Sequence, residues 1–144
     1  MKHKLHAAAA ILAFLFIAAF WGSTLVSEIF LSTDTVVSVK RGIAWALAGF
    51  IPLMLMTAGS GFALAGQGRH PLLLAKRRRM PFIAANGLLI LVPAALFLST
   101  RAQSGQFDTV FYTVQAIELI AGAINLLLLG RNIHDGMHLH GRFA

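Results

Sequence analysis

The chain has 144 residues and a net charge of +7, with 58% hydrophobic residues, 12% charged residues and no cysteine. A soluble domain carries about 25% charged residues, so this composition excludes an ordinary soluble enzyme, a disordered tail and a nucleic-acid-binding domain, and it indicates an integral membrane protein. The lack of cysteine excludes a disulfide framework, a thiolate nucleophile and iron–sulfur clusters held by cysteine.

Four apolar stretches are long enough to cross a bilayer, which takes about 20 residues of helix. In chain order, the predicted spans cover residues 5–27, 36–66, 81–99 and 109–131. Backbone groups in hydrocarbon must be satisfied within the segment, so each span is expected to be a helix. The connections are short, which favours antiparallel neighbours. We therefore predict an all-α, up-down-up-down bundle of four transmembrane helices that forms a single domain over residues 1–144.

The distribution of lysine and arginine predicts the orientation of this bundle. Basic residues favour the cytoplasmic side, and nine of the twelve lie in the N-terminus, the middle loop or the C-terminus. We expect both termini, a basic loop at 67–80 and a His-rich tail at 132–144 to be cytoplasmic, with the bacterial inner membrane as the location. The other three basic residues, Lys40, Arg41 and Arg101, are expected at the opposite membrane interface.

Two surface features predict partners in the membrane. Four consecutive basic residues in the middle loop, Lys76, Arg77, Arg78 and Arg79, are expected to contact anionic lipid headgroups at about 1 kcal/mol per residue. Pairs of small residues four apart, such as Gly59 with Ala63 and Gly61 with Ala65, predict close packing of helices within the chain; a homodimer or a larger membrane complex is the alternative.

A polar stripe runs along the fourth span. Glu118 lies roughly 15 Å past Asp108, near the bilayer midplane. Burial disfavours the charged carboxylate, so Glu118 is expected to be neutral unless it is paired. It could donate to a carbonyl freed by Pro52 or Pro93, or it could be the functional group, accepting a proton or contacting a quinone. The residues that share its helix face are Gln115, Gly122, Asn125 and Asn132.

Glu118 is therefore the candidate catalytic residue, and Gln115, Asn125 and Asn86 are candidate ligand-binding residues. Asn86 in the third span and Asn125 in the fourth lie at matching depth, so they are expected to bond across the helices.

All six histidines fall on the predicted cytoplasmic side. They could simply snorkel at the interface. They could instead bind b-type haem, which needs two neutral imidazoles from different helices; the pair would join His6 or His70 to His134 or His138. A third interpretation is a divalent metal at His134 and His138, which are four residues apart and would share a helix face.

Three functional hypotheses follow from these features. The first is a protein that binds a ligand in its bundle, with b-type haem and quinone-linked electron transfer as its specific form. The second is a non-enzymatic accessory or assembly subunit of a larger membrane complex. The third is an oligomeric transporter linked to protons or cations, with Glu118 as the binding site. No complete catalytic constellation is present in the sequence, which leaves open whether the protein is an enzyme.

Overall fold

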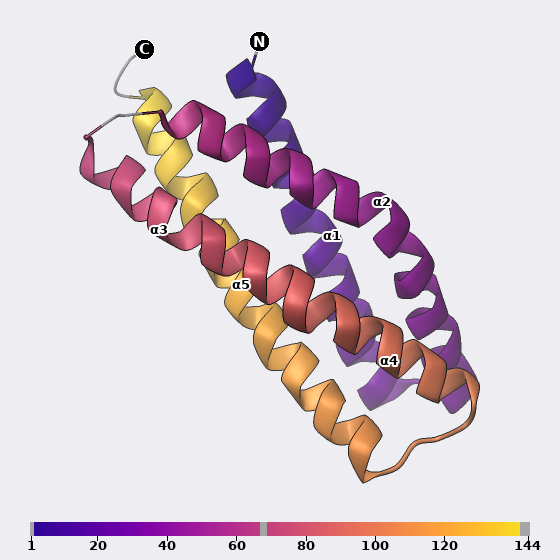
Figure 1. Cartoon of the computed structure of the whole chain (residues 1–144). Coiled ribbons are helices and arrows are strands. Elements are labelled where there is room, and N and C mark those ends of the chain that lie inside the picture. The colour runs from indigo at the N-terminus through magenta and orange to yellow at the C-terminus, as the bar shows by residue number, and fades with distance from the viewer. Residues whose placement is uncertain (1, 67–68, 142–144) are drawn as a thin grey trace.

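Long helices account for almost all of the fold (Figure 1). A computed structural model describes residues 2–66 and 69–141. The helices are α1 (Lys2–Phe30), α2 (Thr33–Ala65), α3 (Pro71–Asn86), α4 (Val92–Gln103) and α5 (Thr109–Gly141), and a π-helical turn, Gly87–Leu91, joins α3 to α4. The segment Pro71–Gln103 is thus one continuous rod, and four helices are long and apolar enough to cross a membrane. Within the described ranges the fold contains no strand.

The four long helices pack as a closed ring. Helix α1 contacts α2 and α5, α2 contacts the α3–α4 rod, and the rod contacts α5. The chain ends lie together at one end of the bundle (Figure 1), which we call the terminal end. The opposite end holds the turns at residues 31–32 and 104–108 and is called the loop end.

The helices extend further than the predicted spans. The loop predicted at 67–80 is helical from Pro71 onward, which places the four consecutive basic residues in α3. The cause is a cap: His70 Nδ1 accepts a hydrogen bond from the backbone N–H of Leu72 at 3.3 Å, and proline suits the first helical turn. Similarly, α5 continues to Gly141 through most of the predicted tail; residues 142–144 lie outside the described part.

A wider, π-helical turn precedes Pro93 in the rod formed by α3 and α4. Proline lacks an N–H group and crowds the preceding turn of an α-helix. Here the N–H of Val92 donates to the carbonyl of Gly87, five residues back, which forms the π-helical turn. On the preceding turn, Asn86 Nδ2 donates to Asn125 Oδ1 at 2.8 Å and to the carbonyl of Ala121 at 2.9 Å. The expected bond between the two asparagines is therefore present.

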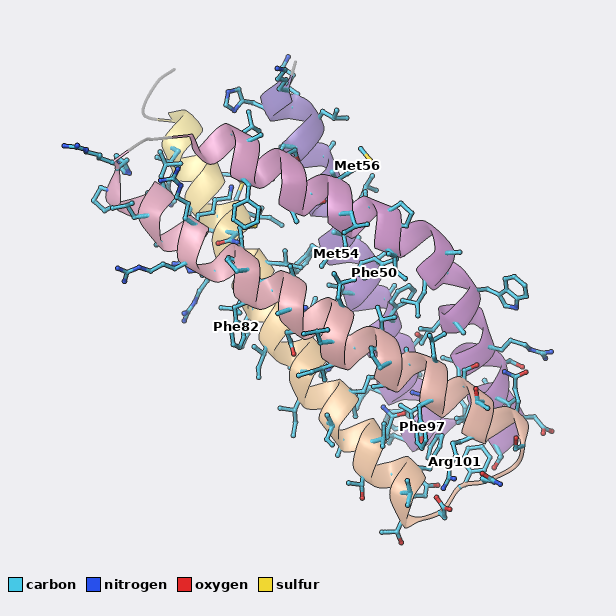
Figure 2. All side chains as sticks on the ribbon, in the orientation of Figure 1. Phe50, Met54, Met56, Phe82, Phe97 and Arg101 are labelled. Atoms are coloured by element: carbon cyan, nitrogen blue, oxygen red, sulfur yellow. The ribbon has the colours of Figure 1, made fainter. Side chains whose placement is uncertain are left out.

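Apolar side chains fill the middle of the bundle and also cover its outside. Phe50 and Met54 lie between the helices, whereas Met56 and Phe82 point outward (Figure 2). Phe50 is 4% exposed and Phe82 is 56% exposed. An outer surface with many large exposed apolar side chains suits contact with lipid tails.

One of the small-residue faces is a packing contact within the chain. A Cβ atom at Gly61 would overlap the Met80 methyl group and lie 3.0 Å from His6 Cε1, whereas a Cβ at Gly59 would meet nothing within 4 Å. Close packing within the chain therefore uses Gly61, and the Gly59 position is open.

We predict that Gly61→Val lowers the free energy of unfolding by about 1–3 kcal/mol more than Gly59→Val, because only the first overpacks the α2–α3 contact. Both variants make the same change in helix propensity, so this contribution cancels in the comparison. Thermal unfolding in detergent measures the difference. A larger loss for Gly59→Val would instead place a contact between copies of the chain on that face.

An ion pair and a helix cap organise the loop end. Asp108 Oδ1 accepts the backbone N–H of Phe111 at 3.0 Å, at the start of α5. Arg101 Nη2 donates to both carboxylate oxygens, at 2.8 and 2.6 Å, and its guanidinium lies 5.4 Å from the Phe97 ring centre. The Phe111 N–H first, and the Arg101 guanidinium second, lower the pKa of Asp108 below its ordinary value of 3.8.

We predict that Asp108→Ala lowers Tm at neutral pH and that this difference disappears in acid. A lowered folded-state pKa contributes stability above the unfolded value of 3.8, and this contribution is lost as the pH falls through the folded value. Thermal unfolding of both proteins across this pH range measures the effect. Asp34→Ala, an exposed acid in the first turn of α2, is the control, and a pH-independent difference at Asp108 would contradict the prediction.

Candidate functional site

A buried ion pair joins α2 to α5. Lys40 Nζ lies 3.0 Å from Glu118 Oε2, and the two side chains are 1% and 12% exposed. Helix α2 begins at Thr33, so Lys40 lies about 10 Å along it. The sequence predicts Lys40 at the membrane interface; the structure adds that its side chain is a core residue, buried between the helices. The structure pairs Glu118 with this lysine, in place of the expected bond from a neutral carboxyl group to a proline-freed carbonyl.

Two further polar side chains complete the shell of the pair. Lys40 Nζ donates to Thr24 Oγ1 of α1 at 3.4 Å. Gln115 Nε2, one turn before Glu118, donates to Glu118 Oε2 at 3.0 Å. Charges buried in a low dielectric need such additional hydrogen bonds, because the Coulomb attraction alone does not offset their lost hydration.

A second carboxylate lies on the helix face that contacts the pair. Glu28 is one turn after Thr24 on α1, and Thr24 Oγ1 lies 3.4 Å from Lys40 Nζ. Glu28 interacts electrostatically with Lys40 and Glu118. Its Oε1 atom is buried without a hydrogen-bond partner, and so is Oε1 of Gln115, a residue that is 4% exposed. We call the five residues Thr24, Glu28, Lys40, Gln115 and Glu118 the buried charge cluster.

A small cavity adjoins this cluster on the side toward the terminal end. Its volume is about 40 Å³, and Thr24, Trp21, Glu118 and Gly122 are among the lining residues. Space of about 10–15 Å³ holds one water molecule, so a few fit. Pockets that hold organic ligands measure about 300–1,000 Å³. The cavity has room for water, with Thr24 and Glu118 as polar groups in an otherwise mostly apolar lining, and it is far smaller than haem or a quinone.

Polar contacts continue along α5 on either side of the cavity. Asn125 is fully buried and donates to the carbonyl of Ile83 at 3.3 Å. Nearer the terminal end, Arg79 donates to Asn132 Oδ1 at 3.2 Å and to Asp135 Oδ2 at 2.7 Å. Arg79 is therefore engaged within the protein, whereas Arg78 is exposed. The stripe predicted on α5 is thus a series of buried hydrogen-bonding groups from the loop end to the terminal end.

The histidines at the terminal end have separate contacts. His6 Nδ1 lies 2.8 Å from Ser60 Oγ, and His70 caps α3. His134 and His138 are exposed neighbours on α5, with 3.1 Å between their Nε2 atoms. Among residues 2–66 and 69–141, no group of three or more His, Cys, Asp or Glu side chains is arranged to hold a metal ion.

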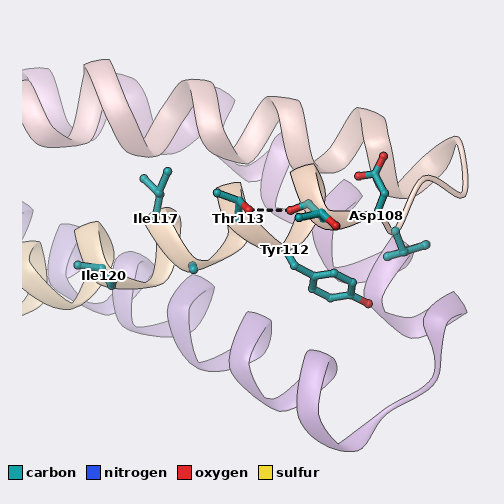
Figure 3. Close-up of a pocket in the computed structure, with 8 residues that line it drawn as sticks. Asp108, Tyr112, Thr113, Ile117 and Ile120 are labelled. Atoms are coloured by element: carbon teal, nitrogen blue, oxygen red, sulfur yellow. Dashed lines mark hydrogen bonds between the residues drawn. The ribbon is translucent and has the colours of Figure 1, made fainter.

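A larger hollow lies on the outside of the bundle at the loop end (Figure 3). It has a volume of about 820 Å³ and follows one face of α5, from Asp108 past Tyr112 to Ile120. Thr113 lines it, but its hydroxyl donates back to the carbonyl of Thr109 at 2.7 Å. The hollow is open and mostly apolar, and its one carboxylate, Asp108, is bound by Arg101. It offers a surface for lipid, whereas the ionisable groups able to do chemistry lie in the buried charge cluster.

No known protein family matches the chain, and comparisons with curated proteins and with solved structures also find no match. Function is therefore argued from the geometry of the site.

Sequence reasoning missed Lys40 and Glu28 as site residues. The available signal was the Ser32-Thr33-Asp34 run, which is typical of a helix N-terminus; Ser32 Oγ accepts the N–H of Thr35 at 3.4 Å and begins α2 there. Counting from that cap places Lys40 inside the helix.

We predict that Lys40→Met lowers the free energy of unfolding by about 3–5 kcal/mol, because the carboxyl groups lose their cation and must either stay unpaired or take up protons in the folded state. Glu118→Met should cost less, since Lys40 still has Glu28 beside it. The double variant should cost less than the sum of the two single variants. Unfolding in detergent at neutral pH measures the cycle, and strict additivity would show that the two charges do not interact.

Proposed function

We propose that the protein is the subunit of an oligomeric, proton-linked transporter in the bacterial inner membrane, with Glu118 as the proton-binding group and Lys40 as its counter-charge. The observation that carries the proposal is the buried Lys40–Glu118 pair with a second carboxylate, Glu28, beside it. Ionisable groups inside a membrane are costly, and they mark ion or proton pathways more often than they add stability.

The positive-inside rule supports an orientation for this transporter. Lysines and arginines gather at the terminal end, which we assign to the cytoplasm. The loop end would then face the periplasm. Glu118 lies nine residues after the start of α5, about 14 Å along the helix. The buried charge cluster would therefore extend from Glu118, near the bilayer midplane, toward the outer interface, and the cavity beside it would lead inward.

The chemistry of the site follows from charge balance. When Glu118 takes up a proton, its attraction to Lys40 falls and the ammonium group is released from its partner. When the proton leaves, the pair forms again. Water entering the cavity beside Glu118 would carry the proton toward the terminal end. One bundle has little room for a larger solute, so a path for a co-transported substrate would need at least two copies.

The other hypotheses have less geometric support. Haem would need His6 or His70 to face His134 or His138, whereas His6 contacts Ser60, His70 caps α3, and His134 and His138 contact each other. The cavity at Glu118 is too small for a quinone. An accessory role is compatible with the exposed small-residue face at Gly59, but it does not explain why charges are buried.

The test is proton flux into liposomes that contain the purified protein and a pH-sensitive dye, with valinomycin and potassium to balance charge. We predict that the native protein conducts protons well above the level of empty liposomes. Glu118→Gln should return the flux to that level, because an amide cannot carry the proton. Asp34→Asn, the same change at an exposed acid, should leave the flux unchanged.

Two results would overturn the proposal. One is a native flux equal to that of empty liposomes, and the other is full flux in a folded Glu118→Gln variant. An absorption spectrum of the same preparation tests the haem hypothesis: a Soret band that is lost in His6→Ala and His138→Ala would support haem. Co-purification with another membrane protein at fixed stoichiometry, without flux, would support the accessory role.

A further inference from the structure

The Lys40–Glu118 ion pair does not account for the carboxylate of Glu28, the remaining acid of the buried charge cluster. Its Oε1 atom is buried without a hydrogen-bond donor, as is Oε1 of the almost fully buried Gln115. Two buried acceptors without donors around one ion pair indicate that a donor or a positive charge is missing.

Counting charges identifies what is missing. Among the described residues, α1 packs against α2 and α5, and the charged groups facing Glu28 from these helices are Lys40 and Glu118. With all three groups ionised, the cluster has one positive and two negative charges. Two carboxylates near a single cation repel each other, which favours protonation of one of them. One further positive charge would balance the cluster.

We infer that Glu28 and Glu118 share a single exchangeable proton and that Lys40 pairs with whichever carboxylate lacks it. This inference rests on the proposed function and adds the proton's entry site to it. In the present structure Lys40 pairs with Glu118, so the proton belongs to Glu28. A lysine suits this role, because its ammonium group has three donors on a flexible stem and can turn between two partners.

The positions of the two carboxylates give the exchange a direction. Glu28 lies two residues before the end of α1, close to the loop end, and Glu118 lies two turns into α5. A proton from water at the loop end would first bind the Glu28 carboxylate. Transfer of that proton to the Glu118 carboxylate leaves Glu28 ionised, and Lys40 moves from Glu118 to Glu28. Charge is conserved in each step, since one proton and one ammonium group exchange places.

Infrared spectroscopy of the purified protein tests the inference without any transport assay, because the C=O stretch of a protonated carboxyl group is separate from carboxylate bands. At neutral pH we expect one such band per chain. The band should disappear in Glu28→Gln and also in Glu118→Gln, because in each variant Lys40 neutralises the one remaining carboxylate. It should increase about twofold in Lys40→Met, where both carboxyl groups become protonated. Asp34→Asn should match the native protein.

Several outcomes would overturn the inference. A native protein without the band has both carboxylates ionised. A band that persists in Glu118→Gln shows that Glu28 binds its proton independently, and a band that persists in Glu28→Gln belongs to another group. A band that disappears when sodium is added assigns the site to a metal cation. If Glu28→Gln fails to fold, Glu28→Asp should shift the band without removing it, and an unshifted band would contradict the assignment.

The spectrum also separates this inference from the proposed transport. If the expected bands are seen but there is no proton flux, the shared proton is supported and the transport proposal is rejected. If proton flux depends on Glu118 but the expected bands are not seen, the transport proposal is supported and Glu28 is rejected as its entry site.

Discussion

The burial of the Lys40 ammonium group constrains the rest of the bundle. Its Nζ atom contacts Thr24 of α1 and Glu118 of α5, so three helices must meet at one level. A lysine that lost these contacts would leave an unpaired charge in an apolar core, which costs several kcal/mol. Sliding any of the three helices by a turn, about 5.4 Å, would break the arrangement. The ion pair therefore sets the register of α1, α2 and α5, which apolar packing alone sets weakly in lipid.

Different polar groups hold the helices together at different levels of the bundle. The level near the loop end contains the buried charge cluster. The middle level contains amides, where Asn86 binds Asn125 beside the π-helical turn. Amide pairs satisfy each other without titrating, so they stabilise α3 against α5 at every pH. Carboxylates can take up protons, so the contacts of the charge cluster depend on pH in a way that the amide contacts do not.

The sequence was sufficient to predict four long helices and the bond between the two asparagines. The helices follow from the length of the apolar stretches, and the bond follows from the matching depth of Asn86 and Asn125. It was insufficient for the helix ends and for the partner of Glu118. Charged residues lower the hydropathy of a segment. The residues from Lys76 to Arg79 were therefore predicted to lie in a loop, and Lys40 was predicted to lie at the membrane interface. Helix formation depends on caps such as His70 and Ser32 instead. Lys40 and Glu118 are 78 residues apart, and no local pattern links residues so distant.

The cation at position 40 is a lysine, and an arginine there would bind the carboxylate differently. Arginine would bind a carboxylate through two parallel hydrogen bonds in a fixed plane, which favours one partner over another. The ammonium group of Lys40 is compact, and in this structure it uses one hydrogen bond to Glu118 and one to Thr24. Its third N–H has no partner in these contacts, and Glu28 supplies a nearby acceptor without a donor. The proposed exchange needs a cation that one proton can redirect, and single hydrogen bonds allow this where a bidentate pair would resist it.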